Sequence, residues 1–165
     1  MAGVRSKYSW VDKGSSFLLA DILAGMLLAQ LEEVETITAK RRKVAMAFME
    51  LYGPYETSGA VRIPHFPAGV EHNGHAVFVI FDTAANRDRY LALLREMDVH
   101  AYIGYLPLHS SKMGQRYGYK SADLPLTEDL ASRIVRLPLY ADLADTGLDY
   151  CLEAMQGVLR TLYGT

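Results

Sequence analysis

One run of residues, from Phe17 to Leu31, is apolar on almost every side of the helix that it predicts. Ser15 or Ser16 can cap the start of that helix. The apolar positions leave no clean polar face: Phe17, Leu18, Leu19, Ile22, Leu23, Met26, Leu27, Leu28 and Leu31. Such a helix needs burial on more than one side, and a chain of 165 residues has one ordinary core. We therefore expect another subunit or domain to cover this helix, and the chain to self-associate through it.

The remaining sequence predicts a second helix, then the order strand, helix, strand, loop, helix, strand, helix. The strands are expected at Val61–Ile63, His75–Phe81, Val99–Leu106 and Val135–Leu139. Helices are expected at about 32–52, 84–97, 127–134 and 145–163. The segment Pro107–Pro125 has little periodicity, so we expect a long, mobile loop there, of the kind that is functional or disordered. The two strands joined by a helix can pair in parallel or antiparallel fashion.

The second helix has a basic face and a sharp predicted end. Lys40, Arg41, Arg42 and Lys43 are consecutive, and we interpret them as a solvated helix face rather than an anion site. Gly53 and Pro54 are expected to end the helix, because glycine favours a helix C-terminus and proline lacks an N–H donor.

Charge and cysteine content exclude several classes of function. The net charge is −2, which disfavours nucleic acid and anionic membranes as partners. The Phe17–Leu31 run is too short and too interrupted to span a bilayer, and the first ten residues lack a signal-peptide core. The only cysteine, Cys151, fits a reducing compartment and is interpreted as a buried small residue. The histidines lack the spacing of a metal site. We expect a cytoplasmic protein.

Four motifs, in order along the chain, resemble one enzyme family. They are YSWVDKGSSFLLADILAGMLLAQLE (Tyr8–Glu32), HNGHAVFVIF (His72–Phe81), YLPLHSSKMGQRYG (Tyr105–Gly118) and RIVRLPLYADL (Arg133–Leu143). They resemble the C-terminal part of the DegT/StrS-type sugar aminotransferases, which depend on pyridoxal phosphate (PLP). The resemblance implies an α+β fold: a small, mainly antiparallel sheet with helices on one face. It also implies a long N-terminal helical segment, residues 1–53, before a small domain, residues 54–165.

The resemblance assigns a cofactor role to the turn Gly14-Ser15-Ser16. In the family this turn lies where one subunit reaches the PLP phosphate of its neighbour, and hydroxyl and N–H groups at a helix start suit a phosphate. Many members carry Asn at the position of Ser16 and Arg at that of Leu18. Leu18 cannot bind an anion, so a phosphate contact here rests on the turn alone. A plain helix cap is the alternative for Ser16.

The resemblance also places a substrate region around Tyr105 and His109, beside the nucleotide-sugar site. Lys112 and Arg116, with Tyr117, can contact the diphosphate or the base, and a solvated loop is the alternative. His109 has no acidic neighbour in the sequence, so no partner for acid–base chemistry is expected.

The lysine that carries PLP in the family lies upstream of the segments matched here, so we expect no catalytic residue and no bound PLP in these 165 residues. The first hypothesis is the C-terminal portion of an aminotransferase that moves an amino group from glutamate to a 4-keto-6-deoxy sugar nucleotide, inactive alone. The alternative is a non-catalytic dimerisation or assembly module. The expected partners are a second copy or a separate large PLP domain. The sequence does not distinguish a natural short protein from a split gene product or a fragment.

Overall fold

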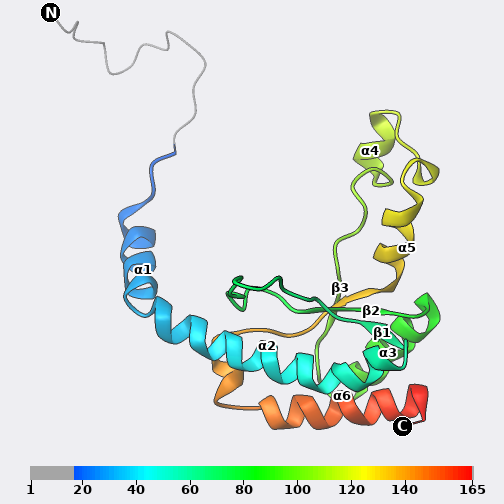
Figure 1. The fold of residues 1–165 in the computed structure, drawn as a ribbon. Coiled ribbons are helices and arrows are strands. Elements are labelled where there is room, and N and C mark those ends of the chain that lie inside the picture. Colours follow the sequence, from blue (N-terminus) through cyan, green and yellow to red (C-terminus); the bar gives the residue numbers. More distant parts are fainter. Residues whose placement is uncertain (1–16, 165) are drawn as a thin grey trace, which may run out of the picture. The chain divides into compact units, whose positions relative to one another are not determined.

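A computed structural model describes residues 17–164 (Figure 1). The chain separates into two units between Val34 and Glu35, and the expected division at residue 53 stays a prediction. The helices are α1 (Asp21–Glu32), α2 (Val34–Thr57), α3 (Ala84–Glu96), α4 (Lys112–Arg116), α5 (Pro125–Arg133) and α6 (Leu148–Tyr163), with short 3-10 helices η1 (Ser121–Asp123) and η2 (Ala141–Ala144). The strands are β1 (Val61–Arg62), β2 (Phe78–Phe81), β3 (Tyr102–Ile103) and β4 (Ile134–Arg136).

The four strands form one antiparallel sheet in the order β1-β2-β4-β3. Val61 pairs with Phe81, and β4 lies between β2 and β3, with Val135 opposite both Val79 and Ile103. The predicted α+β class and the antiparallel pairing are confirmed. Each strand is shorter than predicted, and β4 begins one residue earlier, at Ile134.

Side chains on one face of the sheet form the core. Val79, Phe81 and Val135 are fully buried and pack against α2, α3 and α6. Figure 1 shows α2 and α6 on this side of the sheet. Successive strand residues point to opposite faces, so the neighbours of these residues on β2 and β4 lie on the other face. There the side chains are only half buried. The sheet therefore has a covered face and an open face.

Helix α2 corrects two predictions. It continues past Gly53 and Pro54 to Thr57, because Tyr55 is buried in the core against the Tyr163 ring. The interpretation of its basic residues as a solvated face is wrong for the two arginines. Arg41 donates to the carbonyl oxygens of Gly74 and His75, and Arg42 donates to His72 O.

The segment Pro107–Pro125 is not a structureless loop. It contains α4 and η1, and both have side-chain caps that sequence periodicity does not show. Ser111 Oγ accepts a hydrogen bond from Gly114 N at 3.1 Å, and Asp123 Oδ2 accepts one from Lys120 N at 2.7 Å. Serine and aspartate at such positions offset the loss of backbone partners at a helix start. Two short helical turns therefore replace the expected loop.

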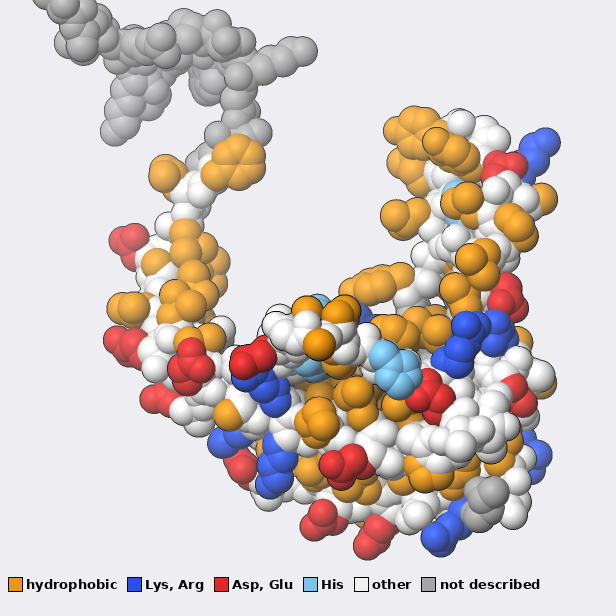
Figure 2. Space-filling view, in the orientation of Figure 1, with side chains coloured by type: hydrophobic (Ala, Val, Ile, Leu, Met, Phe, Trp, Pro, Cys, Tyr) orange, Lys and Arg blue, Asp and Glu red, His pale blue; other side chains and the backbone are white. Residues whose placement is uncertain are grey.

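Helix α1 is apolar on all sides, as the sequence indicates. It begins at Asp21 rather than at Phe17, and its large apolar side chains are exposed in the described chain, among them Ile22, Met26 and Leu28. Figure 2 shows these side chains along the helix. Within residues 17–164, no helix combines the length and the hydropathy that crossing a membrane requires.

Candidate functional site

The turn Gly14-Ser15-Ser16, predicted to contact the cofactor phosphate, lies outside the described residues. Its role stays a prediction. The other predicted site residues, Tyr105, His109, Lys112 and Arg116, all lie in the described chain.

His109 is buried, with 8% of its surface exposed. Its Nε2 atom lies 3.1 Å from Glu128 Oε1 on α5, so the expectation of no acidic neighbour is wrong. Sequence reasoning missed this pair because 18 residues separate the two positions along the chain. Backbone packing holds the pair in place: a Cβ atom on Gly114 would lie 2.2 Å from His109 O and 2.4 Å from Leu108 O. Glycine at this position lets α4 pack directly on the backbone of residues 108–109.

An apolar cavity of about 680 Å³ lies beside His109. Its lining residues come from the α4 region and the start of α5: Leu108, His109, Ser111, Met113, Gly114, Tyr117, Tyr119, Leu124 and Thr127. The Nε2 atom of His109 is closed to solvent and has Glu128 Oε1 as its ion-pair partner, without hydrogen-bond geometry, so His109 is a polar residue in a largely apolar wall. Pockets with such composition suit small molecules that carry a few polar groups.

Lys112 and Arg116 lie on α4 with exposed side chains and do not line this cavity. Tyr105 is also outside it, and its side chain is 82% exposed. The four predicted substrate residues are therefore not gathered in one cavity. They occupy two places, the α4 region and the open face of the sheet.

Tyr105 has a partner that sequence reasoning missed. Arg136, on β4, donates from Nη1 to Tyr105 Oη at 3.1 Å, and its guanidinium carbon lies 5.4 Å from the centre of the Tyr105 ring. A cation over an aromatic face at this distance is attracted by the ring. A charged residue within an otherwise apolar strand was the one feature of the sequence that could have pointed to Arg136.

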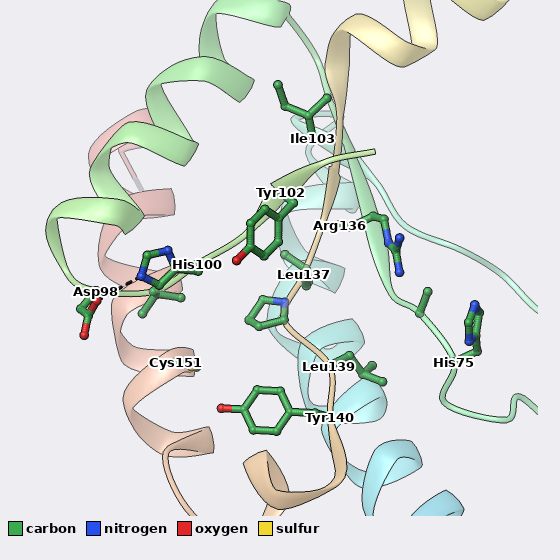
Figure 3. Close-up of a pocket in the computed structure, with 13 residues that line it drawn as sticks. His75, Asp98, His100, Tyr102, Ile103, Arg136, Leu137, Leu139, Tyr140 and Cys151 are labelled. Atoms are coloured by element: carbon green, nitrogen blue, oxygen red, sulfur yellow. Dashed lines mark hydrogen bonds and ion pairs between the residues drawn. The ribbon is translucent and has the colours of Figure 1, made fainter. Parts of the chain in front are cut away.

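A second cavity, of about 560 Å³, lies at the β3 edge of the sheet (Figure 3). His100 and Asp98, 3.1 Å apart, lie at one end of it, and Arg136 and His75 lie at the other. Cys151 lines the cavity and is half buried, and burial raises the pKa of its thiol. A raised pKa lowers the thiolate fraction, which agrees with a packing role rather than a nucleophilic one. No three His, Cys, Asp or Glu side chains among the described residues are grouped as metal ligands.

The lysines of the described chain do not fit the attachment of PLP. PLP needs a lysine amine at its reactive carbon and an acid at its ring nitrogen. Lys40 pairs with Asp145 at 2.6 Å, and Lys43 donates to Ala144 O. Lys112 and Lys120 are exposed. The cavities of about 680, 560 and 380 Å³ are lined by no lysine, so we assign no step of PLP chemistry to these residues.

Three proteins illustrate what the chain resembles. The dTDP-3-amino-3,4,6-trideoxy-alpha-D-glucose transaminase of Micromonospora megalomicea is 28% identical over 90% of this chain and 40% of its own length. A DegT DnrJ EryC1 StrS aminotransferase from Brucella abortus is 26% identical, with a TM-score of 0.74 over 92% of this chain and 39% of its own. A protein from Streptococcus pneumoniae named as a sugar aminotransferase, solved in its PLP form, shares the fold: the TM-score is 0.76 at 17% identity, over 87% of this chain and 36% of its own.

The similarity covers nearly all of this chain but only part of each relative. The chain spans about 40% of the length of the curated proteins that it matches. The family model described as "DegT/DnrJ/EryC1/StrS aminotransferase family" matches residues 2–156. That match includes helices α1 to α5, the first part of α6 and the whole sheet. The chain therefore belongs to the DegT/DnrJ/EryC1/StrS aminotransferase family.

Proposed function

We propose that this chain supplies the small-domain part of a PLP-dependent sugar aminotransferase. The reaction moves an amino group from glutamate to a 4-keto-6-deoxy sugar carried on a nucleotide. The observation that carries the proposal is the family match over residues 2–156. The relative from Micromonospora is named for a dTDP-linked amino sugar, which supports dTDP as the carrier.

The finer substrate assignment rests on the turn Gly14-Ser15-Ser16 and the Trp10-Val11-Asp12 run before it. This form of the motif resembles dTDP-4-amino-4,6-dideoxygalactose transaminase. In the proposal, Gly14, Ser15 and Ser16 contact the cofactor phosphate of a neighbouring subunit. Backbone N–H groups and hydroxyls at a helix start are suitable donors for that anion.

The nucleotide sugar is proposed to contact Tyr105, His109, Lys112 and Arg116. Support for His109 is its buried place in the wall of the apolar cavity, with Glu128 3.1 Å away. The Glu128 carboxylate restricts the position of the imidazole in that wall. Lys112 and Arg116 are exposed charges on α4, where they attract a diphosphate from outside the cavity.

The PLP-binding lysine is proposed to lie on a polypeptide segment other than the described residues. Helix α1 then provides an interface, either with that large PLP domain or with a second copy in a homodimer. Its exposed apolar side chains support an interface, because exposed apolar surface of this extent marks an interaction site or an aggregation hazard. In this arrangement the 165 residues have no transaminase activity alone.

A second candidate function is a non-catalytic assembly module derived from the same family. The observation that favours it is α1 itself, since no described side chain of that helix is buried. The module predicts binding to a partner without amino transfer.

The test is reconstitution. The purified chain is mixed with a separately produced lysine-bearing domain of a family relative, and glutamate-dependent amination of a dTDP-4-keto-6-deoxy sugar is followed by mass spectrometry. The proposal predicts turnover in the mixture only. Binding without turnover supports the assembly module, and absence of both contradicts the two candidates together.

A control treats the chain alone with PLP and borohydride. We expect no stoichiometric adduct on one defined lysine. A single modified lysine at full yield would contradict the proposed division between the two polypeptide segments.

A further inference from the structure

Arg136 is fixed on the open face of the sheet by two neighbouring strands. It ends β4, and its backbone pairs with Phe78 on β2 and Tyr102 on β3. Its neighbour Val135 points into the core and is fully buried, so the alternation of a strand directs Arg136 away from the core. A cation on a central strand is more rigidly placed than one on a loop.

Tyr105 completes the support of this guanidinium. The Arg136 Nη1 atom donates to the Tyr105 hydroxyl at 3.1 Å, with the ring centre 5.4 Å from the guanidinium carbon. Arginine is suited to stacking and to forked hydrogen bonds at once, because its guanidinium is planar and carries several N–H donors. The tyrosine uses one donor and leaves the others free for a further acceptor.

The charge of Arg136 is not balanced within the described chain. Three other arginines of residues 17–164 have a carboxylate within ion-pair distance: Arg42 pairs with Glu71, Arg87 with Asp88 and Arg133 with Asp129. No carboxylate within that range of residues forms an ion pair with Arg136, although its side chain is half buried. A partly desolvated cation without an anion gains most from an added oxyanion, since the bonds are charge-assisted.

Two cavities meet at this residue. The 560 Å³ cavity and a smaller one of about 260 Å³ are both lined by His75, Ala76 and Arg136. The backbone at His75 is itself held, because its carbonyl oxygen accepts a hydrogen bond from Arg41 Nη2 at 2.9 Å. Tyr105 lines the smaller cavity, and Tyr102 lines the larger one. A small molecule can therefore place its anionic group at Arg136 and its body along either cavity.

We propose that Arg136, held by Tyr105, is the anion-binding residue of this chain and takes a carboxylate or phosphate group of the substrates. This inference rests on the proposed function for its ligands, because glutamate supplies a carboxylate and the nucleotide sugar supplies a diphosphate. Both groups offer oxygens to a forked donor. Arg136 is a binding residue in this account and transfers no proton.

The experiment titrates the purified 165-residue chain with dTDP in one arm and L-glutamate in the other, and follows NMR shifts of backbone amides. Arg136→Gln removes the charge and leaves a shorter polar side chain. Arg160→Gln is the matched control, since Arg160 is an exposed arginine in the last turn of α6. Circular dichroism and thermal melts establish that each variant is folded.

The expected result is a loss of affinity of at least about tenfold in Arg136→Gln for one probe, the scale of a charge-assisted hydrogen bond. Arg160→Gln should bind as the original chain does. Arg136→Lys keeps the charge without the fork and should fall between the two. Tyr105→Phe keeps the ring and should change affinity by less than about threefold, since only one neutral acceptor is lost.

The two arms identify the source of the anion. If Arg136→Gln loses affinity for dTDP alone, Arg136 binds the nucleotide phosphate. If it loses affinity for glutamate alone, Arg136 binds the carboxylate of the amino donor. Equal binding by Arg136→Gln and Arg160→Gln overturns the proposal, as does the absence of saturable binding of both probes to the original chain. The reconstitution assay measures turnover separately, so failure here and failure of the proposed function are distinguishable.

Discussion

The two sides of the sheet differ in how completely their side chains are buried. On the covered face, Phe48, Tyr90 and Leu94 are fully buried by helices α2, α3 and α6. On the other side, the segment 105–128, which we call the α4–α5 lobe, exposes large apolar side chains such as Leu108 and Leu126. Figure 2 shows hydrophobic side chains on the surface of the lobe. Folding stability therefore comes mainly from the covered face, and the open side is the surface that remains for ligands or another domain.

The largest expected effect is on stability, and a matched pair of leucine truncations compares the covered face with the lobe. Leu94 is fully buried and Leu108 is 85% exposed. Leu94→Ala should lower the free energy of unfolding by about 2–5 kcal/mol, because it leaves a cavity in the core. Leu108→Ala should change it by less than about 0.5 kcal/mol. Urea unfolding followed by circular dichroism measures both, and equal losses would show that the lobe is part of the cooperative core.

A glycine pair tests whether the lobe has a packed centre of its own. At Gly114 an added Cβ would meet two carbonyl oxygens, whereas at Gly157 on α6 it would meet nothing within 4 Å. Gly114→Ala should cost about 1–3 kcal/mol by overpacking. Gly157→Ala should stabilise the chain by up to about 1 kcal/mol through helix propensity. Hydrogen exchange should show faster exchange in α4 for the first variant only. Unchanged protection of the α4 amides in Gly114→Ala would mean that the lobe accommodates the added methyl group without a tightly packed centre.

A buried pair of tyrosines tests whether a shared hydrogen bond stabilises the covered face. The hydroxyls of Tyr52 and Tyr90 bond to each other in the core, and burial raises the pKa of both phenols. Tyr52→Phe leaves the buried Tyr90 hydroxyl without its partner and should lower the free energy of unfolding by about 1–3 kcal/mol. The double variant with Tyr90→Phe should recover part of that loss, since neither hydroxyl is then left alone. Thermal unfolding of the three variants gives the comparison, and a strictly additive double variant would contradict a shared bond.

The smallest expected effect is a change in how the stability of the chain depends on pH in acid. Burial tends to raise the pKa of Asp82, but hydrogen bonds from Asn86, Tyr163 and Thr83 N outweigh it and hold that pKa below its usual value. A lowered folded-state pKa contributes stability above the unfolded pKa of about 4, and the contribution disappears as the pH falls through the folded value.

Asp82→Asn should therefore flatten the fall of the melting temperature below about pH 4. Glu96→Gln, at an exposed site at the end of α3, serves as the surface control. If the melting temperature falls equally steeply in acid for Asp82→Asn and for the original chain, the lowered pKa of Asp82 does not contribute to stability.

The covered face was largely predictable from sequence. The runs around Val79 and Val135 and the spacing of Tyr90 and Leu94 follow periodicities that belong to a half-buried strand and an amphipathic helix. The end of α2 was not predictable, because burial of Tyr55 overrides the local signal of Gly53-Pro54. Tertiary contacts decided that position, and local propensity did not.

The candidate site was less predictable, since its contacts join distant residues. His109 meets Glu128, and Tyr105 meets Arg136, 31 residues away. The resemblance to the family pointed to Tyr105 and His109 but not to either partner. No periodicity in the sequence encodes such pairs, because they depend on strand register and on the packing of α4 against its own preceding turn.

Hydrogen exchange of the chain with and without dTDP tests whether ligands bind on the open side of the sheet. We expect slower exchange in β4 and residues 102–128 when dTDP is present, with α2, α3 and α6 unchanged, and loss of the effect in Arg136→Gln. Protection confined to the helices of the covered face, or the same protection in Arg136→Gln, would contradict this expectation.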